Sequence, residues 1–370
     1  MLGIYIHIPF CLSKCPYCDF YSLPYRKELA QQYVQAAVRA VQTAPAAGQA
    51  VDSVYFGGGT PVLLGERLLE ILSAVRRHFA VQPESEITLE ANPAAMTFAQ
   101  LQALREGGFN RISMGVQSAS DRELQTLGRR HSFAQAQQSV QMAQAAGFQN
   151  VSVDLMLGTP GQTAQAIDRF VETFDALGVQ HISGYLLKIE PGTPFARQHI
   201  ERDCPDEERS AELYLHTVEQ MARHGFLQYE VSNFARPGFE SRHNLKYWRC
   251  EQYLGLGPAA HSFWEGRRFY FPRDLAGFVA AQDPWALRVD DGPGGELEEQ
   301  LMLRLRLCEG ISLDWIREHF SSDTKKLEQR ARFLQQHGLT RLEGDRLRLT
   351  PQGFLVSNSV IVDLLETVEI

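Results

Sequence analysis

The sequence predicts an α/β protein built on a parallel sheet, and three observations support this fold class. Short apolar runs typical of buried strands recur through the first half of the chain. Stretches with helical periodicity lie between these runs, and glycines follow several of them, where helices commonly end. Strands that alternate with helices imply right-handed crossovers, which either an open doubly wound sheet or a barrel would satisfy. The six strands are expected over residues 4–8, 53–56, 86–91, 111–116, 151–157 and 181–187.

The intervening helices and the second half of the chain follow from the same patterns. After a long helix over 206–224 we expect an irregular, aromatic-rich region over 226–273 and a linker at Asp290–Gly295. Three helical segments and a hairpin turning at Gly344 then resemble a winged-helix module. The other helices are expected over 27–43, 63–79, 98–106, 132–146 and 163–176. The predicted domains are a barrel over 1–234, a connecting region over 235–295 and a C-terminal helical module over 296–370.

Composition excludes several classes of protein. The net charge of −8 argues against a nucleic-acid binder and against an anchor for anionic membranes. No apolar run reaches the roughly 18 residues of a membrane span, and the first residues lack the features of a signal peptide. The six cysteines do not show the spacing of a disulfide scaffold. We therefore expect a reduced, cytoplasmic protein.

Polar residues follow each predicted strand, and in barrels the carboxyl ends of the strands form the active face. Any one of them alone is more simply a helix cap or a turn residue, but six consecutive strand exits are hard to explain that way. They are Cys11–Cys18, Gly57–Thr60, Glu90, Gln117, Asp154, and Lys188 with Glu190.

The first of these exits contains three cysteines, Cys11, Cys15 and Cys18, spaced Cys-x3-Cys-x2-Cys without a nearby fourth. A structural zinc site takes four ligands, and His7 would complete a Cys3His set. A 4Fe–4S cluster held by three thiolates instead leaves one iron open to another ligand. The spacing also matches one face of a helix, although Pro16 counts against a regular one.

This triplet, with an aromatic residue before its last cysteine, resembles the radical S-adenosylmethionine superfamily. The resemblance implies that the missing fourth ligand is the cofactor, whose amino and carboxylate groups chelate the open iron. FGGGTP at 56–61 supports it, because glycines let a backbone approach a ligand and offer it N–H groups and carbonyls.

Further segments, among them YIHIPFC, TLEANP and VSVDLMLGTPGQT, are similar to oxygen-independent coproporphyrinogen III oxidase and to the haem chaperone HemW family. The resemblance implies an incomplete (β/α)6 radical-SAM barrel whose open side admits a tetrapyrrole. It also implies that S-adenosylmethionine contacts one group of residues and, as in the oxidase, that a second molecule contacts another; Lys188 stands where the oxidase has a small residue. The first group is Tyr5, Gly58 and Glu90, and the second is Tyr17, Gly59, Thr60, Gln117, Arg129 and Asp154.

The sequence HNxxYW supplies a candidate haem site at His243, Asn244, Tyr247 and Trp248. Histidine is a common axial ligand of haem, and flat aromatic rings pack on a porphyrin. From the residues alone, a loop that packs the C-terminal module onto the barrel is the simpler interpretation. The family resemblance links the motif to haem, with His261 and Cys250 as alternative ligands.

The predicted function is haem binding and delivery to respiratory or membrane acceptor proteins, with a 4Fe–4S cluster, S-adenosylmethionine and an electron donor, and peripheral contact with a membrane during delivery. Coproporphyrinogen oxidation is one alternative, and a zinc-binding interaction module is another. Oxidation is not expected, because Asp19-Phe20 replaces the Cys-x-Cys ending of the oxidases and the chain starts only ten residues before Cys11. The sequence does not decide the oligomeric state, for which a homodimer is one alternative.

Overall fold

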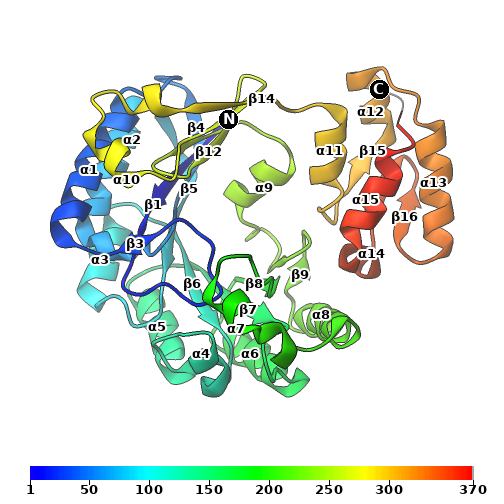
Figure 1. Ribbon diagram of the computed structural model, residues 1–370, viewed down its shortest axis with the longest axis horizontal. Coiled ribbons are helices and arrows are strands. Elements are labelled where there is room, and N and C mark those ends of the chain that lie inside the picture. Colours follow the sequence, from blue (N-terminus) through cyan, green and yellow to red (C-terminus); the bar gives the residue numbers. More distant parts are fainter. Residues whose placement is uncertain (369–370) are drawn as a thin grey trace.

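The computed structural model describes residues 1–368, and its central feature is a sheet of twelve strands. The six predicted strands lie side by side in its middle, all parallel and in chain order. The predicted incomplete (β/α)6 barrel is therefore confirmed (Figure 1). These strands are β1 (Leu2–Ile8), β4 (Ala50–Gly58), β5 (Ala80–Ala91), β6 (Arg111–Gln117), β7 (Asn150–Leu157) and β8 (His181–Leu186).

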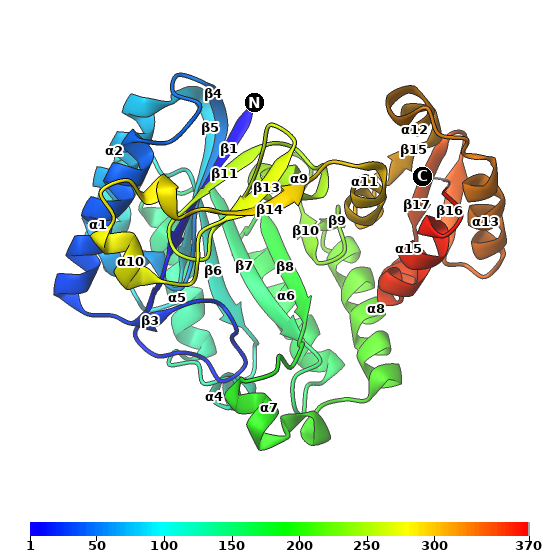
Figure 2. The same cartoon turned by 45° about the horizontal axis from the view of Figure 1, so that its top comes forward.

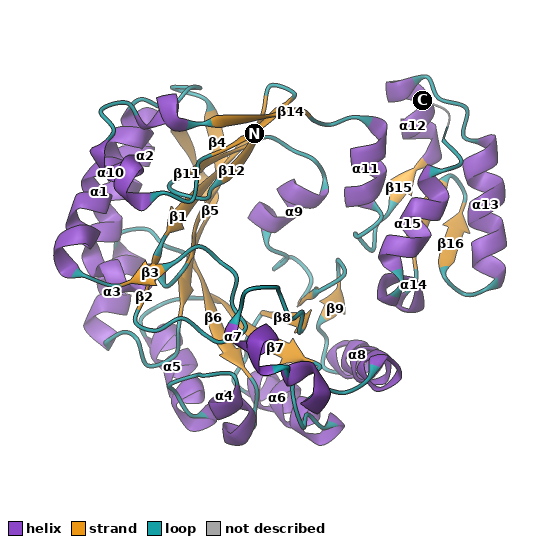
Figure 3. Ribbon diagram, in the orientation of Figure 1, coloured by secondary structure: helices purple, strands orange, loops and turns teal. Residues whose placement is uncertain are grey.

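Helices cover the outer face of this sheet (Figure 3). Two of them begin with reciprocal capping boxes, Thr97 with Gln100 and Ser132 with Gln135, as the sequence allows. The helices between β1 and β10 are α1 (Lys27–Gln42), η1 (Pro61–Arg67), α2 (Leu68–His78), α3 (Phe98–Glu106), α4 (Asp121–Thr126), α5 (Phe133–Ala145), α6 (Ala164–Ala176), α7 (Pro194–Gln198), η2 (Ile200–Asp203) and α8 (Glu207–Arg223).

The alternation of side chains along each strand separates the core from the barrel interior. On β1, the side chains of Ile4, Ile6 and Ile8 are fully buried in the main hydrophobic core. Tyr5 and His7 alternate with them and carry hydrogen-bonding groups toward the interior. The same alternation on neighbouring strands lines the interior with polar side chains, namely Ser53, Glu86, Thr88, Arg111, Ser113, Ser152, His181 and Ser183.

Additional strands extend the sheet at both edges, which corrects two expectations. The region expected to be irregular contributes most of them, and β14 starts where a linker was expected. The strands have two to five residues, too few for a period-2 pattern to be recognised. They are β9 (Leu227–Gln228), β10 (Asn233–Ala235), β11 (Tyr253–Leu256), β12 (His261–Trp264), β13 (Arg267–Tyr270) and β14 (Val289–Pro293). Between β13 and β14 lie α10 (Leu275–Ala280) and η3 (Pro284–Leu287), and β2 (Phe10–Cys11) pairs with β3 (Leu23–Pro24).

The C-terminal module has the expected three helices followed by a hairpin, with two more helices after it. It contacts the rest of the chain through backbone hydrogen bonds such as Cys308 N–H to the Tyr229 carbonyl at 2.9 Å. Residues 369–370 of the expected module lie outside the described residues. Its elements are α11 (Leu297–Arg304), β15 (Ile311–Ser312), α12 (Leu313–Phe320), α13 (Lys325–Gln336), β16 (Thr340–Glu343), β17 (Arg346–Leu349), α14 (Pro351–Leu355) and α15 (Ser357–Leu365).

Helix α9 (Arg242–Trp248) carries HNxxYW and lies between the sheet and the C-terminal module (Figure 1). Its N-terminal end contacts Ser53 of β4 and Glu86 of β5. These two residues lie level with Gly3, near the start of β1, so α9 lies toward the amino end of the barrel. No helix within residues 1–368 is long and apolar enough to cross a membrane.

Candidate functional site

The three cysteines lie in the segment between β1 and α1, at the carboxyl end of the strands (Figure 2). Cys11 ends β2, and a turn closed by the Cys18 N–H and the Cys15 carbonyl at 3.1 Å brings the other two together. All three are partly buried, and burial raises the pKa of the Cys18 thiol. The Pro16 carbonyl accepts from the Phe195 N–H at 3.0 Å, which fixes the loop against α7.

A chain of hydrogen bonds connects Cys11 with Cys15. The Thr60 hydroxyl lies 3.7 Å from Cys11 Sγ and accepts from the Asn92 amide at 3.0 Å. Arg129 donates to Asn92 Oδ1 at 2.6 Å and to Cys15 Sγ at 3.5 Å. Donors aimed at sulfur favour thiolates, the form that binds metal. Asn92 was missed in the sequence, although it directly follows a predicted strand.

The donor set fits an iron–sulfur cluster better than zinc. His7, the proposed fourth zinc ligand, has both ring nitrogens in use, Nδ1 with the Tyr5 hydroxyl at 3.0 Å and Nε2 with the Tyr21 carbonyl at 2.9 Å. Within residues 1–368, no three His, Cys, Asp or Glu side chains stand in an arrangement that would hold a single metal ion. The three thiols thus share one loop without a fourth protein ligand.

The N–H groups of the glycine run have partners within the protein, whereas its predicted contact with a ligand stays a prediction. The N–H groups of Gly58, Gly59 and Thr60 donate to Glu90 Oε2, the Ile8 carbonyl and the Phe10 carbonyl at 3.0, 2.8 and 2.7 Å. They are therefore not available to a ligand, because the protein uses all three. A Cβ at Gly59 would lie 2.5 Å from the Phe10 carbonyl oxygen, so only glycine permits the run to pack against β2.

Two carboxylates face the barrel interior beyond this run. Glu90 accepts from the Tyr55 hydroxyl at 2.8 Å and from Gly58 N–H, and Asp154 accepts from the Ser113 hydroxyl at 3.3 Å. Burial raises the pKa of Glu90 to about 7 and the pKa of Asp154 to about 6. Both keep partial contact with the open interior. Each can accept further hydrogen bonds there, which suits the hydroxyl and amino groups of a nucleoside-containing ligand.

The remaining predicted cofactor residues surround the same space. Gln117 has a φ of 81° and a buried Oε1 without a hydrogen-bond partner, and the buried Nε of Arg129 lacks one too. Unpaired buried polar atoms cost free energy, so these two are candidates to bind a ligand. Tyr17 packs on Phe195 with ring centroids 6.1 Å apart. Except for Tyr5, which lies in the middle of β1 beside Tyr55, the structure thus gathers the predicted residues at one end of the barrel. Their roles as ligands stay predictions.

The HNxxYW motif lies at the other end, and both ring nitrogens of its histidine have hydrogen-bond partners. His243 has 0% exposed surface, and its Nδ1 and Nε2 lie 2.9 Å from the hydroxyls of Ser53 and Tyr247. Burial lowers its pKa to about 3, so it is neutral. As a haem ligand it would first have to give up one of these two hydrogen bonds.

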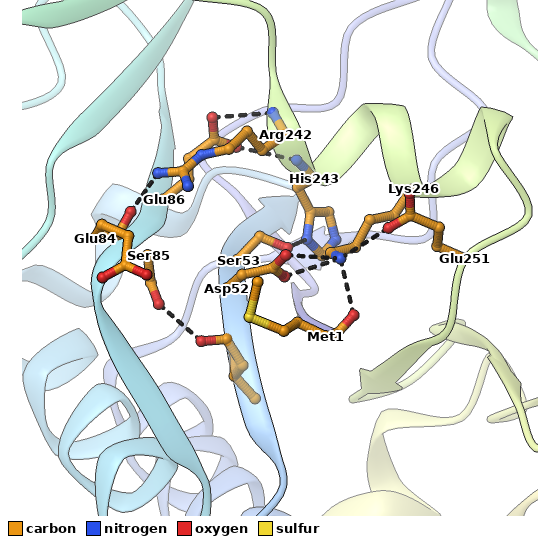
Figure 4. Close-up of polar contacts among 11 residues, drawn as sticks. Met1, Asp52, Ser53, Glu84, Ser85, Glu86, Arg242, His243, Lys246 and Glu251 are labelled. Carbon is orange, nitrogen blue, oxygen red and sulfur yellow. Dashed lines mark hydrogen bonds and ion pairs between the residues drawn. The ribbon is translucent and has the colours of Figure 1, made fainter.

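The charged side chains of Glu86 and Lys246 also hold α9 in place (Figure 4). The Glu86 carboxylate of β5 accepts from the N–H groups of Arg242 at 3.1 Å and His243 at 3.2 Å, which caps the helix. The Lys246 ammonium, whose side chain is 3% exposed, contacts Asp52 at 2.8 Å and Glu251 at 3.1 Å. The motif therefore forms a helix anchored at the amino end of the barrel.

The other two residues of the motif lie on a different face of α9. Asn244 and Trp248, one helical turn apart, are partly exposed. Within residues 1–368, neither of their side chains forms a hydrogen bond or ring contact. Of the alternative ligands, His261 is exposed and stacks on Tyr270, whereas Cys250 contacts Glu299 and Arg268. Lys188 is 81% exposed and paired with Glu190.

Comparison with known proteins gives matches over the whole chain. Residues 5–174 match the Radical SAM superfamily, and residues 296–356 match the HemN C-terminal domain. The chain is 37% identical to the haem chaperone HemW of Mycobacterium tuberculosis over 98% of this chain and 94% of that protein. It is 34% identical to the haem chaperone HemW of Bacillus subtilis, with 97% and 98% covered. The coproporphyrinogen III oxidase HemN of Escherichia coli has a similar fold, with a TM-score of 0.84 at 22% identity over 98% of this chain and 89% of that one.

The parallel barrel with a three-cysteine loop at the carboxyl end of its first strand is that of a radical S-adenosylmethionine protein. The superfamily implies a 4Fe–4S cluster and S-adenosylmethionine, which together supply one-electron chemistry. Within this class, the chain belongs to the family of the haem chaperone HemW.

Proposed function

We propose that this protein is a haem chaperone, which binds haem and passes it to acceptor proteins. The observation that carries the proposal is the identity of 37% with a haem chaperone over nearly the full length of both chains. The HNxxYW motif supports it, because α9 presents an unpartnered aromatic side chain, Trp248, between the barrel and the C-terminal module.

In this proposal Cys11, Cys15 and Cys18 hold the cluster, and the residues at the carboxyl end of the barrel hold S-adenosylmethionine. Respiratory or membrane proteins are the acceptors, and a separate electron donor reduces the cluster. Haem packs on the face of α9 formed by Asn244 and Trp248, since these two side chains are the ones without partners. His243 and Tyr247 support haem binding by holding the helix.

The test compares haem titrations of reconstituted wild-type protein and variants, followed by the Soret band. Trp248→Ala is expected to lower haem affinity about tenfold, because burial and stacking of an aromatic ring are worth at least about 1.4 kcal/mol. Phe333→Ala, which removes an aromatic side chain 45% exposed on α13, is the matched control and should bind haem normally. Equal haem affinity of the two variants would show that haem does not bind at this helix.

His243→Ala separates axial ligation from packing. A Soret band shifted in position would identify His243 as a ligand, which requires α9 to move, whereas weaker binding with an unshifted band supports the packing role. A coproporphyrinogen assay with reductant and S-adenosylmethionine completes the test. Multiple-turnover formation of protoporphyrin would overturn the chaperone proposal in favour of oxidative decarboxylation.

A further inference from the structure

Tyr55 connects the HNxxYW helix with the predicted S-adenosylmethionine site. It lies in the middle of β4, between α9 at one end of the barrel and Glu90 toward the other. Its ring stacks on His243 with centroids 5.3 Å apart and an interplanar angle of 27°. Its hydroxyl donates to Glu90 Oε1 at 2.8 Å. One side chain therefore contacts both regions.

The support on which Tyr55 stacks cannot rotate freely. Hydrogen bonds to Ser53 and Tyr247 hold both nitrogens of the His243 ring, and Glu86 accepts from its backbone N–H. Tyr5 flanks the pair, with its ring 6.1 Å from Tyr55 and 6.4 Å from His243. The ring of Tyr55 thus rests on a residue of α9 that is itself held in place.

The Glu90 carboxylate is fixed at both oxygens. Oε1 accepts from Tyr55, and Oε2 accepts from Gly58 N–H at 3.0 Å. A glutamate side chain that is free to rotate loses up to about 2 kcal/mol of conformational entropy when a ligand orders it. With two donors already in place, most of this ordering precedes ligand binding, while the remaining lone pairs stay available to a ligand.

We propose that Tyr55 is a positioning residue: held by His243, it orients Glu90 for S-adenosylmethionine, so that α9 contributes to cofactor binding from the opposite end of the barrel. The inference rests on the proposed function in one respect, since it takes Glu90 as a contact of the cofactor. It assigns to His243 and Tyr55 a role that does not involve haem.

Tyr55→Phe is the decisive variant, because it keeps the ring and its stacking and removes only the hydroxyl. Tyr214→Phe is the matched control: it removes a buried tyrosine hydroxyl on α8 that donates to the Val231 carbonyl at 2.9 Å and accepts from the Gln228 amide at 2.8 Å, without contact to Glu90. Glu90→Gln and the double variant Tyr55→Phe/Glu90→Gln complete the set.

The measurements are the dissociation constant of S-adenosylmethionine for the reconstituted protein and the change that the cofactor causes in the electron paramagnetic resonance spectrum of the reduced cluster. We expect Tyr55→Phe to weaken binding about tenfold, the factor for a hydrogen bond of about 1.4 kcal/mol to a charged group. Its iron content and haem titration should match those of Tyr214→Phe. The double variant should bind no more weakly than Glu90→Gln alone, because Tyr55 acts through Glu90.

The outcomes separate the inference from the function on which it rests. Wild-type affinity in Tyr55→Phe, with reduced affinity in Glu90→Gln, would overturn the positioning role and leave the cofactor site intact. Additive losses in the double variant would show that Tyr55 does not act through Glu90. Wild-type affinity for S-adenosylmethionine in Glu90→Gln would refute both the cofactor contact and the inference. If the wild-type protein does not bind haem, only the chaperone function is refuted.

Discussion

The residues that hold α9 at the amino end of the barrel differ from two polar residues at the carboxyl end. At the amino end, His243, Glu86 and Lys246 direct every polar side-chain atom to a partner within the protein, at 2.8–3.5 Å. At the carboxyl end, Gln117 and Arg129 each keep a buried polar atom without a partner. The contacts that hold α9 are therefore complete within the protein, although the buried Arg111 Nε and Asn150 Oδ1 at the starts of β6 and β7 also lack partners. Gln117 and Arg129 keep polar atoms that a ligand could satisfy.

The largest expected effect comes from removing a cysteine at the carboxyl end. Cys11→Ala should abolish retention of a complete 4Fe–4S cluster after anaerobic reconstitution, because three thiolates are the minimum for such a site. Iron and sulfide analysis measures this. Cys204→Ala, which removes a partly buried cysteine outside the loop, should keep the full iron content. Full iron retention in Cys11→Ala would show that other residues bind the cluster.

At the amino end, Lys246→Met should destabilise the fold by about 3–5 kcal/mol, since it leaves Asp52 and Glu251 without their buried partner. Urea unfolding gives the free-energy difference. Lys325→Met, at a lysine 85% exposed and 3.9 Å from Asp323, should change it by less than about 1 kcal/mol. Equal effects of the two substitutions would contradict the view that the amino end is held by its ionic contacts.

A smaller effect concerns pH. The pKa of Glu90 is raised to about 7 in the folded protein, so folding favours its protonated form. Stability from this group is fully present below its ordinary pKa of about 4.5 and is lost as pH rises through 7. Replacement by glutamine should therefore remove about 3 kcal/mol of the decrease in unfolding free energy between pH 4.5 and 8. Glu70→Gln, at an exposed position on α2, should leave the slope unchanged; a slope unchanged in Glu90→Gln as well would show that this carboxyl titrates normally.

The smallest effect is expected for Asn92→Ala, which interrupts the hydrogen bonds between Thr60 and Arg129. The cluster should still form, but its half-life under a chelator should fall about fivefold, corresponding to about 1 kcal/mol for one lost hydrogen bond. Asn358→Ala removes an exposed amide that accepts from Arg306 and serves as the control. Identical half-lives would show that the network does not stabilise the loop.

Much of this organisation could be predicted from the sequence, because its signals are local. The six strands and the cysteine loop follow from apolar runs and from spacing within fewer than ten residues. The choice of an incomplete barrel over an open doubly wound sheet came from the family resemblance. The strands β11 to β14 could not be predicted, since β11 acquires its partner from β1, far away along the chain. The sequence also could not show that both ring nitrogens of His243 form hydrogen bonds, with Ser53 and Tyr247, while the Trp248 side chain has no partner. A motif shows which residues occur and not which of their atoms already have partners.

The pairing of β1 with β11 has a consequence for the synthesis of the protein. Gly3 lies opposite Tyr253, so this edge of β1 has no partner until some 250 residues have been added. At about 5–20 residues per second, translation needs roughly 10–50 s to supply it. During that interval the cysteine loop and the glycine run have already emerged, but α9 and β11 have not. The nascent chain therefore passes through a period in which its cysteine loop is exposed and the barrel is open at one edge.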